Sequence, residues 1–392
     1  MRQKKVRATK AIIHLENFSH NLTEIKKCLS AETKMCVAVK ADAYGHGAVK
    51  CAQVAEKQGA AFLAVATVEE GAELRAAGIK TPILMLSLCA PEEIPEAVAN
   101  DITPFVFDEE YALLFDAEVL RQNKKDYCVH IAVDTGMGRI GVYENEAASL
   151  AGKISLCKGI KLGGMATHLA VSDSVTASSV EYTKNQFEKF KRAIENVKKE
   201  GIDPGICHCA NSAATLAFPE FHLDMVRPGI ITYGYYADEV DREYLKSRNI
   251  DVDLKPVMTV ETSVCAVRDV FKGESVGYGR TWCAEENTKV GVLTAGYADG
   301  ILRNYSSSGV KISVNGKLYP ICGRICMDQF MINLGKDGEN GTVKRWDKAV
   351  IFGAEEDGAL LTADDIARLT GTISYEVTCC ISKRVRRIFI NS

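Results

Sequence analysis

Five side chains that could take part in chemistry stand at or just past the end of an apolar run. They are Lys40, Arg139, His168, Ser212 and Arg227. Lys40 directly follows the run Met35–Val39, and a lysine there either extends its charge to water or holds its amine at the mouth of a site. The carboxyl ends of parallel barrel strands meet at one face, where barrel enzymes have their active sites. The five residues therefore predict one site if the runs are barrel strands.

The last two of these runs are followed by groups that could bind phosphate. A barrel commonly holds phosphate in the loops after its seventh and eighth strands. Those loops offer the Ser212 hydroxyl and the N–H groups of Gly229 and Ile230, and Gly229 has no side chain to block approach. A phosphate pocket across from a lysine suggests pyridoxal 5′-phosphate, because lysine amines form Schiff bases with it. By spacing alone, a strand-end lysine in another barrel enzyme remains an alternative.

The apolar runs themselves have the spacing of a parallel barrel. Eight runs alternate with helical segments: CVAVK (36–40), FLAVAT (62–67), ILMLS (83–87), PFVF (104–107), VHIAVDT (129–135), GGMATHL (163–169), ICHCANS (206–212) and MVRPGI (225–230). Nearly continuous apolar runs indicate strands buried on both faces. Thr67 and Glu70 form a capping-box signature before a helix that stops at Gly78, and residues 182–200 carry a helical apolar stripe. We therefore expect a (β/α)8 barrel.

Beyond about residue 248 the sequence changes character. Short alternating runs are separated by Gly, Asn and Asp turns, which is typical of an all-β domain. The expected domains are a cofactor-binding barrel over residues 1–248 and a mostly-β domain over residues 249–392.

The composition excludes several classes of protein. An apolar content of 47% and a net charge of −3 are those of an ordinary globular protein, with no basic surplus for nucleic acid or an anionic membrane. No apolar run is long enough to span a membrane or to form a signal peptide. Fourteen cysteines are scattered without paired C-x-x-C motifs. We therefore expect no metal site, and reduced thiols in a cytoplasmic protein.

Nine segments resemble, in order, the signature segments of the alanine racemase family. They are AVKADAYGHG (38–47), VHIAVDTGMGRIG (129–141), MATHLAVSD (165–173), HCANSAATL (208–216), MVRPGI (225–230), VGYGRTW (276–282), GYADG (296–300), GRICMDQF (323–330) and TISYEV (372–377). The resemblance covers nearly the whole chain. It implies a pyridoxal 5′-phosphate-dependent homodimer, with a barrel and a β domain, that interconverts L-alanine and D-alanine and supplies D-alanine for peptidoglycan.

The resemblance also implies roles for the matched residues. Lys40 would carry the cofactor and act as one acid/base group. The other cofactor contacts would be Tyr44, His168, Asn211, Ser212, Arg227, Gly229 and Ile230. Arg139 and the backbone N–H of Met327 would receive the substrate carboxylate.

Tyr278 is implied as the second base, supplied by the partner subunit. Racemisation removes a proton from one face of Cα and returns one to the other face, so two bases on opposite sides suit it. Arg227 is implied at the pyridine nitrogen. Because a guanidinium only donates hydrogen bonds, that nitrogen would stay unprotonated, and a weaker electron sink favours racemisation over transamination.

Two positions depart from the family pattern. Ala132 stands where many members have a carbamylated lysine that supports the substrate-binding arginine, so we expect a chloride or a water-filled gap beside Arg139. Lys383 stands where many members have a tyrosine near the phosphate and the substrate pocket. A lysine there predicts either a contact with the phosphate or extra room in the pocket.

These departures leave other functions open. Extra room would admit serine, so a serine or broad-specificity amino-acid racemase is the alternative prediction. A non-catalytic pyridoxal-phosphate-binding protein is a further alternative. Such proteins are usually a lone barrel, whereas this chain has a second domain that contains Tyr278 and Met327.

Overall fold

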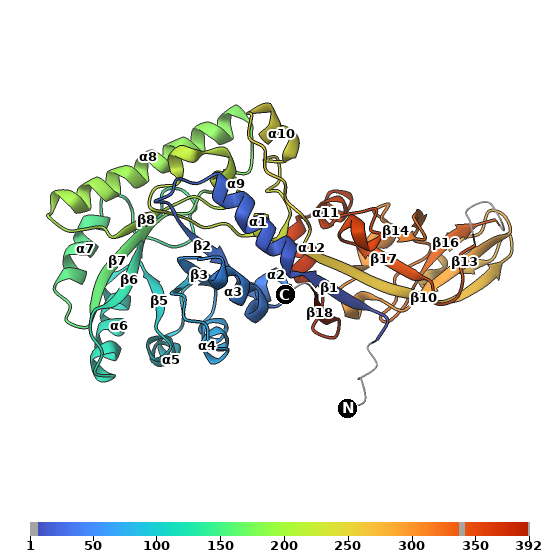
Figure 1. Ribbon diagram of the computed structural model, residues 1–392, viewed down its shortest axis with the longest axis horizontal. Coiled ribbons are helices and arrows are strands. Elements are labelled where there is room, and N and C mark those ends of the chain that lie inside the picture. The colour runs from blue at the N-terminus through green and yellow to red at the C-terminus, as the bar shows by residue number, and fades with distance from the viewer. Residues whose placement is uncertain (1–6, 337–341, 391–392) are drawn as a thin grey trace.

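The computed structural model describes residues 7–336 and 342–390. Figure 1 shows two units arranged along the long axis of the molecule, one of strands and surrounding helices and one made mostly of strands. Within the described residues, no helix has both the length and the apolar character needed to cross a membrane.

The first unit is a parallel eight-stranded barrel, as the sequence predicts. Its sheet has the order β8-β7-β6-β5-β4-β3-β2-β9. The strands are β2 (Lys34–Ala38), β3 (Phe62–Val65), β4 (Ile83–Met85), β5 (Ile102–Val106), β6 (Tyr127–Ala132), β7 (Ile160–Ala166), β8 (Ile206–His208) and β9 (Met225–Val226). Asp224 donates its N–H to Cys207 O at 3.1 Å and Arg227 to Ala210 O at 2.8 Å. These two bonds join the first and last segments of the sheet and nearly close the barrel.

Helices surround this sheet. They are α1 (Leu15–Lys27), α2 (Lys40–Tyr44), α3 (Ala48–Lys57), α4 (Val68–Ala76), α5 (Ile94–Ala99), α6 (Glu109–Arg121), α7 (Ala147–Ser155), α8 (Ala177–Lys199), α9 (Ser212–Ala217) and α10 (Arg242–Ser247). The predicted capping box is present, since Thr67 accepts the N–H of Glu70 at the start of α4. Helix α8 begins before the predicted residue 182, because the Thr176 side chain caps it by accepting the N–H of Ser179.

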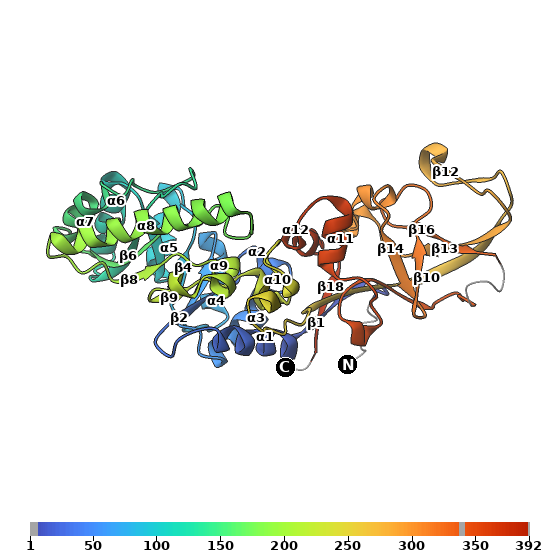
Figure 2. The ribbon, with the colours of Figure 1, turned by 90° about the horizontal axis from the view of Figure 1, so that it is seen from above.

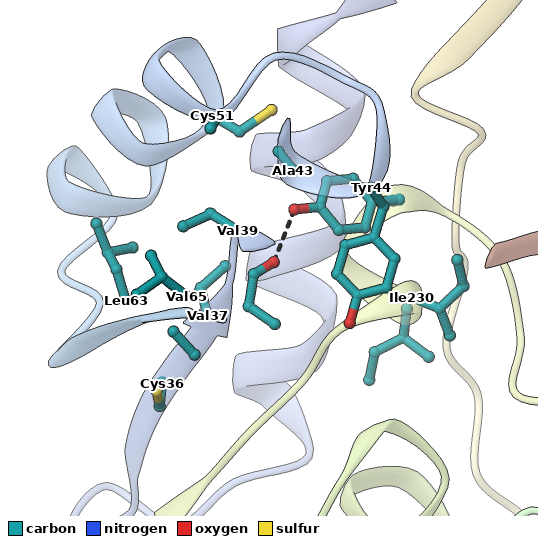
Figure 3. Close-up of a cluster of buried hydrophobic side chains, with 14 of the residues drawn as sticks. Cys36, Val37, Val39, Ala43, Tyr44, Cys51, Leu63, Val65 and Ile230 are labelled. Atoms are coloured by element: carbon teal, nitrogen blue, oxygen red, sulfur yellow. Dashed lines mark hydrogen bonds between the residues drawn. The ribbon is translucent and has the colours of Figure 1, made fainter. Parts of the chain in front are cut away.

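Buried aliphatic side chains fix the strand that leads to Lys40. Figure 3 shows Val37 and Val39 among Leu63, Val65 and other buried residues. The Tyr233 hydroxyl, which belongs to the same buried cluster, donates to Ala38 O at 2.7 Å. The end of β2 is therefore held by packing and by a hydrogen bond, so the residue that follows it has a defined place.

The second unit contains most of the remaining strands. They are β10 (Met258–Val270), β11 (Ser275–Val276), β12 (Trp282–Cys283), β13 (Thr288–Leu293), β14 (Lys311–Val314), β15 (Lys317–Pro320), β16 (Phe330–Gly335), β17 (Lys348–Phe352) and β18 (Arg386–Ile390). Two helices that the sequence analysis did not predict, α11 (Ala363–Thr370) and α12 (Ser374–Cys379), lie beside the barrel in Figures 1 and 2. Helix α12 contacts α2, so the second unit reaches the turn that carries Lys40.

The N-terminal strand joins the second unit although it precedes the barrel in the chain. Strand β1 (Lys10–His14) pairs antiparallel with β10 and parallel with β18. Residues 10–14 were expected in the first unit, but these pairings put them in the second sheet. A strand that pairs with residues more than 240 positions away along the chain has no local sequence signal for its location.

Candidate functional site

Lys40 begins a left-handed turn at the mouth of the barrel. Ala41, Asp42, Ala43 and Tyr44 have φ values of 51°, 52°, 54° and 53°. For residues other than glycine, this conformation costs about 1–2 kcal/mol each, so surrounding contacts must hold it. His46, which the sequence analysis did not assign to the chemistry, supplies two of them, because its Nδ1 donates to Ala43 O at 2.9 Å and to Tyr44 O at 3.0 Å.

A cavity of about 370 Å³ opens beside this turn. Lys40, Arg139, His168 and Arg227 line it, together with apolar residues, Ser87 and Thr167, and no carboxylate is among the described residues of its wall. Burial, and then the positive charge of Arg139, lower the pKa of Lys40. Burial lowers the pKa of His168 to about 3, so its imidazole is neutral near pH 7. The cavity thus suits an anionic ligand and keeps an amine that can lose its proton.

Arg227 is buried and most of its donors are occupied. Its NH1 group donates to His208 Nδ1 at 2.7 Å and to His208 O at 2.9 Å. Its NH2 group donates to Thr167 O at 2.8 Å and contacts His168 Nδ1 at 3.4 Å. None of these contacts uses the Nε–H of the guanidinium. It is therefore available to a ligand atom that accepts a hydrogen bond.

Two histidines that the sequence analysis did not assign to the site set the orientation of Arg227. Since a guanidinium can only donate, His208 Nδ1 must accept, and its proton must lie on Nε2. That Nε2 lies 2.9 Å from His130 Nδ1, which therefore accepts in turn. Burial, with Arg227 adding to it, lowers the pKa of both histidines. His208 therefore holds the guanidinium of Arg227 through its Nδ1 and its carbonyl oxygen.

Arg139 lies on the loop after β6, and Asp134 shapes that loop. Asp134 Oδ1 accepts the N–H of Gly136 at 2.9 Å and that of Gly138 at 3.1 Å. Arg139 is exposed and borders the cavity. Ala132 is buried in the same wall. Among the described residues, the cavity wall around Arg139 therefore holds no anion to pair with its charge.

Four residues expected to bind phosphate come together next to the cavity. Gly229 donates its N–H to Ser212 Oγ at 2.8 Å, and a Cβ on Gly229 would stand only 2.6 Å from the Tyr44 hydroxyl. Ile230 begins the 3-10 helix η3 (Ile230–Tyr233), and the first N–H groups of a helix have no acceptor within it. Tyr44, Ser212, Gly229 and Ile230 thus form a candidate phosphate cradle, which presents two hydroxyl groups and the first N–H groups of η3. In this structure the Gly229 N–H donates to Ser212 Oγ, and its contact with a phosphate stays a prediction.

The Asn211 side chain caps the helix that carries Ser212, and its predicted contact with the cofactor stays a prediction. Its side-chain oxygen accepts the N–H of Ala214 at 3.1 Å, which caps α9, and it also accepts the Ser172 hydroxyl at 2.9 Å. Asn211 therefore positions Ser212, which is the first residue of α9.

Tyr375 is a site residue that the sequence analysis missed. Its hydroxyl interacts with Ser212, and its ring centroid lies 5.6 Å from that of Tyr44. The matched segment TISYEV contained it, and that was the available signal. Lys383 does not reach this cradle: it is exposed and lines a separate cavity with Asp42, Glu70 and Arg387. The expectation that Lys383 replaces an aromatic residue at the phosphate is therefore wrong, because Tyr375 already fills that place.

Tyr278 and Met327 lie outside the Lys40 cavity of their own chain. Tyr278 begins the 3-10 helix η4 (Tyr278–Arg280) between β11 and β12, and Figure 2 shows β12 at the end of the molecule away from α2. Tyr278 is 68% exposed and Met327 is 52% exposed. Both belong to the second unit, and neither lines the cavity of its own chain.

The loop that carries Met327 is clamped by its neighbours. Tyr297 and Ala298 donate their N–H groups to Cys326 O at 3.0 Å and Met327 O at 3.1 Å. Gly296 permits this approach, since a Cβ there would meet Met327 O at 2.4 Å. Below the loop, the buried Asp299 accepts hydrogen bonds from Arg7 and Arg384, and Arg384 also binds Asp328 at 2.6 Å.

We expect Asp299→Asn to lower the unfolding free energy by about 2 kcal/mol, because two guanidiniums would lose a buried carboxylate. Burial opposes ionisation of Asp299, yet the two arginines hold its pKa below the ordinary value. Its contribution is therefore present above about pH 4 and is lost as the pH falls through the lowered pKa. Denaturant unfolding at several pH values measures both effects. The exposed Asp328→Asn is the control, and an equal loss in the two variants would contradict the prediction.

Comparisons with known proteins agree over the whole chain. Two family models match it, "Alanine racemase, N-terminal domain" over residues 13–237 and "Alanine racemase, C-terminal domain" over residues 257–389. An alanine racemase of Treponema denticola is 48% identical and covers 98% of this chain and 99% of its own. The solved alanine racemase of Clostridium difficile 630 has a TM-score of 0.90 at 36% identity, covering 99% of this chain and 97% of that one. That of Bacillus anthracis, solved with bound L-Ala-P, has a TM-score of 0.88 at 34% identity, covering 99% and 96%.

Proposed function

Because this chain belongs to the alanine racemase family, we propose that it interconverts L-alanine and D-alanine by a two-base mechanism. Lys40 serves one face of the substrate Cα, and Tyr278 of the partner subunit serves the other. The observation that carries the proposal is the cationic cavity, in which an amine of lowered pKa lies beside two arginines. The product D-alanine would supply peptidoglycan synthesis in the cytoplasm.

The family is dependent on pyridoxal 5′-phosphate, and the residues present fit that group. Tyr44, Ser212 and the start of η3 form a cradle for its phosphate, and the lack of a side chain at Gly229 keeps the cradle open. Lys40 provides the amine for the covalent link, and the Nε–H of Arg227 provides a donor for the pyridine nitrogen. When bound, the cofactor supplies an electron sink for negative charge at the substrate Cα.

Two bases on opposite faces account for a reaction in both directions. In one direction Lys40 removes the proton and Tyr278 of the partner subunit returns one to the other face; in the reverse direction their roles exchange. The lowered pKa of Lys40 suits this work. A phenol brought into a cavity that holds Arg139 and Arg227 is stabilised as the phenolate by their charges. The exposure of Tyr278 supports its donation to a second copy of the chain.

The substrate carboxylate would bind Arg139 and the backbone N–H of Met327 of the partner subunit. We expect Arg139→Leu to raise KM for alanine about 100-fold, since a charged hydrogen bond contributes roughly 1.5–3 kcal/mol. Steady-state kinetics measure this change in KM. The control is Arg192→Leu, because Arg192 is an exposed arginine on the outer helix α8 that pairs with Glu144. An unchanged KM in Arg139→Leu would remove Arg139 from the substrate site.

The alternative of serine or broader specificity has lost the observation that favoured it. It depended on extra room at Lys383, and that residue lies outside the cavity. Chiral analysis of L-alanine and L-serine incubated with the purified chain and pyridoxal phosphate tests the proposal. We expect rapid formation of D-alanine and a kcat/KM for serine about 100-fold lower. No D-alanine would contradict the proposed function, and comparable rates would restore the broader specificity.

A further inference from the structure

Glu70 connects two strand ends at the mouth of the barrel. Its Oε2 accepts the N–H of Ala66 at 2.7 Å and that of Thr67 at 3.4 Å. Its Oε1 accepts the N–H of Ala41, the residue after Lys40, at 2.6 Å. Ala66 follows β3 and Lys40 follows β2, and these strands are parallel neighbours. One half-buried carboxylate therefore ties the Lys40 turn to the adjacent strand end.

The role of Glu70 as a helix cap does not explain both contacts. A capping box requires one carboxylate oxygen at the N-cap N–H, and Oε2 meets this need at Thr67. The second oxygen is directed instead to the first residue of the left-handed turn. Since non-glycine residues resist the left-handed conformation, an acceptor fixed at the start of the turn helps to keep the turn, and with it Lys40, in place.

We propose that Glu70 is a positioning residue for Lys40, holding the lysine turn through Ala41 and facing the amine with a negative charge. This inference rests on the proposed function of Lys40 as the lysine that binds the cofactor. Four ionisable groups act most strongly on the amine: Arg139, Arg227, Cys379 and Glu70. His168 faces it across the same cavity. Glu70 is the one carboxylate among these four groups. Its negative charge opposes the two arginines, which lower the pKa of Lys40.

Two substitutions separate geometry from charge. In Glu70→Gln, one acceptor oxygen becomes an NH2 group, so either Ala41 or Ala66 faces a donor and the negative charge is gone. In Glu70→Asp, the charge remains but the side chain is one methylene too short to span both strand ends. The control is Glu73→Gln, because Glu73 lines the same outer cavity as Glu70 but is exposed and lies one helical turn further along α4.

The measurement is the rate at which the full-length, cofactor-free chain forms its covalent link with added pyridoxal phosphate, followed by visible absorbance from about pH 7 to about pH 10. In Glu70→Gln, we expect the plateau rate at high pH to fall about tenfold and the midpoint to move down by about 0.5 pH unit, because loss of the anion disfavours the ammonium form. Glu70→Asp should lower the plateau without moving the midpoint. Glu73→Gln should change neither.

The outcomes distinguish this inference from the proposed function. If Glu70→Gln lowers the plateau rate but leaves the pH midpoint unchanged, the residue is merely structural and the inference is overturned. The inference is also overturned if Glu70→Gln has the same plateau rate and midpoint as Glu73→Gln. Borohydride reduction and peptide mapping show which lysine is labelled. A label at Lys40 leaves the proposed function intact whatever the rates. A label on another lysine would overturn both.

Discussion

Mixing two inactive variants, Lys40→Ala and Tyr278→Phe, should restore roughly a quarter of the wild-type racemase activity after subunit exchange. Half of the dimers then contain one chain of each kind. If each site combines Lys40 of one chain with Tyr278 of the other, a mixed dimer has one intact site and one doubly defective site. Each variant alone should lose about 10³-fold or more in kcat, because a proton-transfer group is missing.

The same experiment separates a shared site from one built within a chain. If both residues served the same chain, no mixed dimer would contain an intact site, and mixing would recover nothing. The separation of η4 from α2 and the 68% exposure of Tyr278 favour the shared site. Tyr278→Phe should keep the visible absorbance of the bound cofactor. Full activity in Tyr278→Phe would contradict its role as a base, and an inactive wild-type chain that binds the cofactor would favour the alternative of a non-catalytic carrier.

Arg227→Glu should lower the rate of racemisation about 10³-fold and produce keto acid as a side product. In the proposed function the wild-type guanidinium would donate to the pyridine nitrogen, and a guanidinium cannot give that nitrogen a proton. A carboxylic acid at the same position would hold a proton against that nitrogen, which strengthens the electron sink and prolongs the carbanion. Chiral chromatography and a keto-acid assay measure the two products.

Arg227→Lys is the matched control for this prediction. It keeps a positive donor in the same buried place but loses the pairing with His208 Nδ1, so we expect slower racemisation without keto acid. Retention of the bound cofactor, seen by its visible absorbance, shows that both variants are folded. Keto acid from Arg227→Lys, or none from Arg227→Glu, would contradict the explanation of reaction specificity by the pyridine nitrogen.

The barrel and several site residues were predictable because their signals are local. Eight apolar runs correspond to β2–β9, and the capping box marks the start of α4. The cationic side chains Lys40, Arg139 and Arg227 follow strand ends, and parallel strands must bring such positions to one face.

Other features had no local signal. The left-handed turn contains Ala41, Asp42 and Ala43, and none of them is a glycine, the residue type that would have predicted positive φ values. Strand β1 takes its partners from the far end of the chain. Tyr375 comes from α12, a helix of the second unit that the repeated turns had suggested would be strand.

By itself, the sequence determined the order of strands and helices and the kinds of side chain at the strand ends. Their chemistry follows from residue type. Only the tertiary structure decided how each group is oriented. His208 accepts from Arg227 and donates to His130 on its other side, and Glu70 reaches Ala41 because β2 and β3 are neighbours. Hydrogen-bond direction and burial depend on residues distant in the chain, so they arise only when the chain is folded.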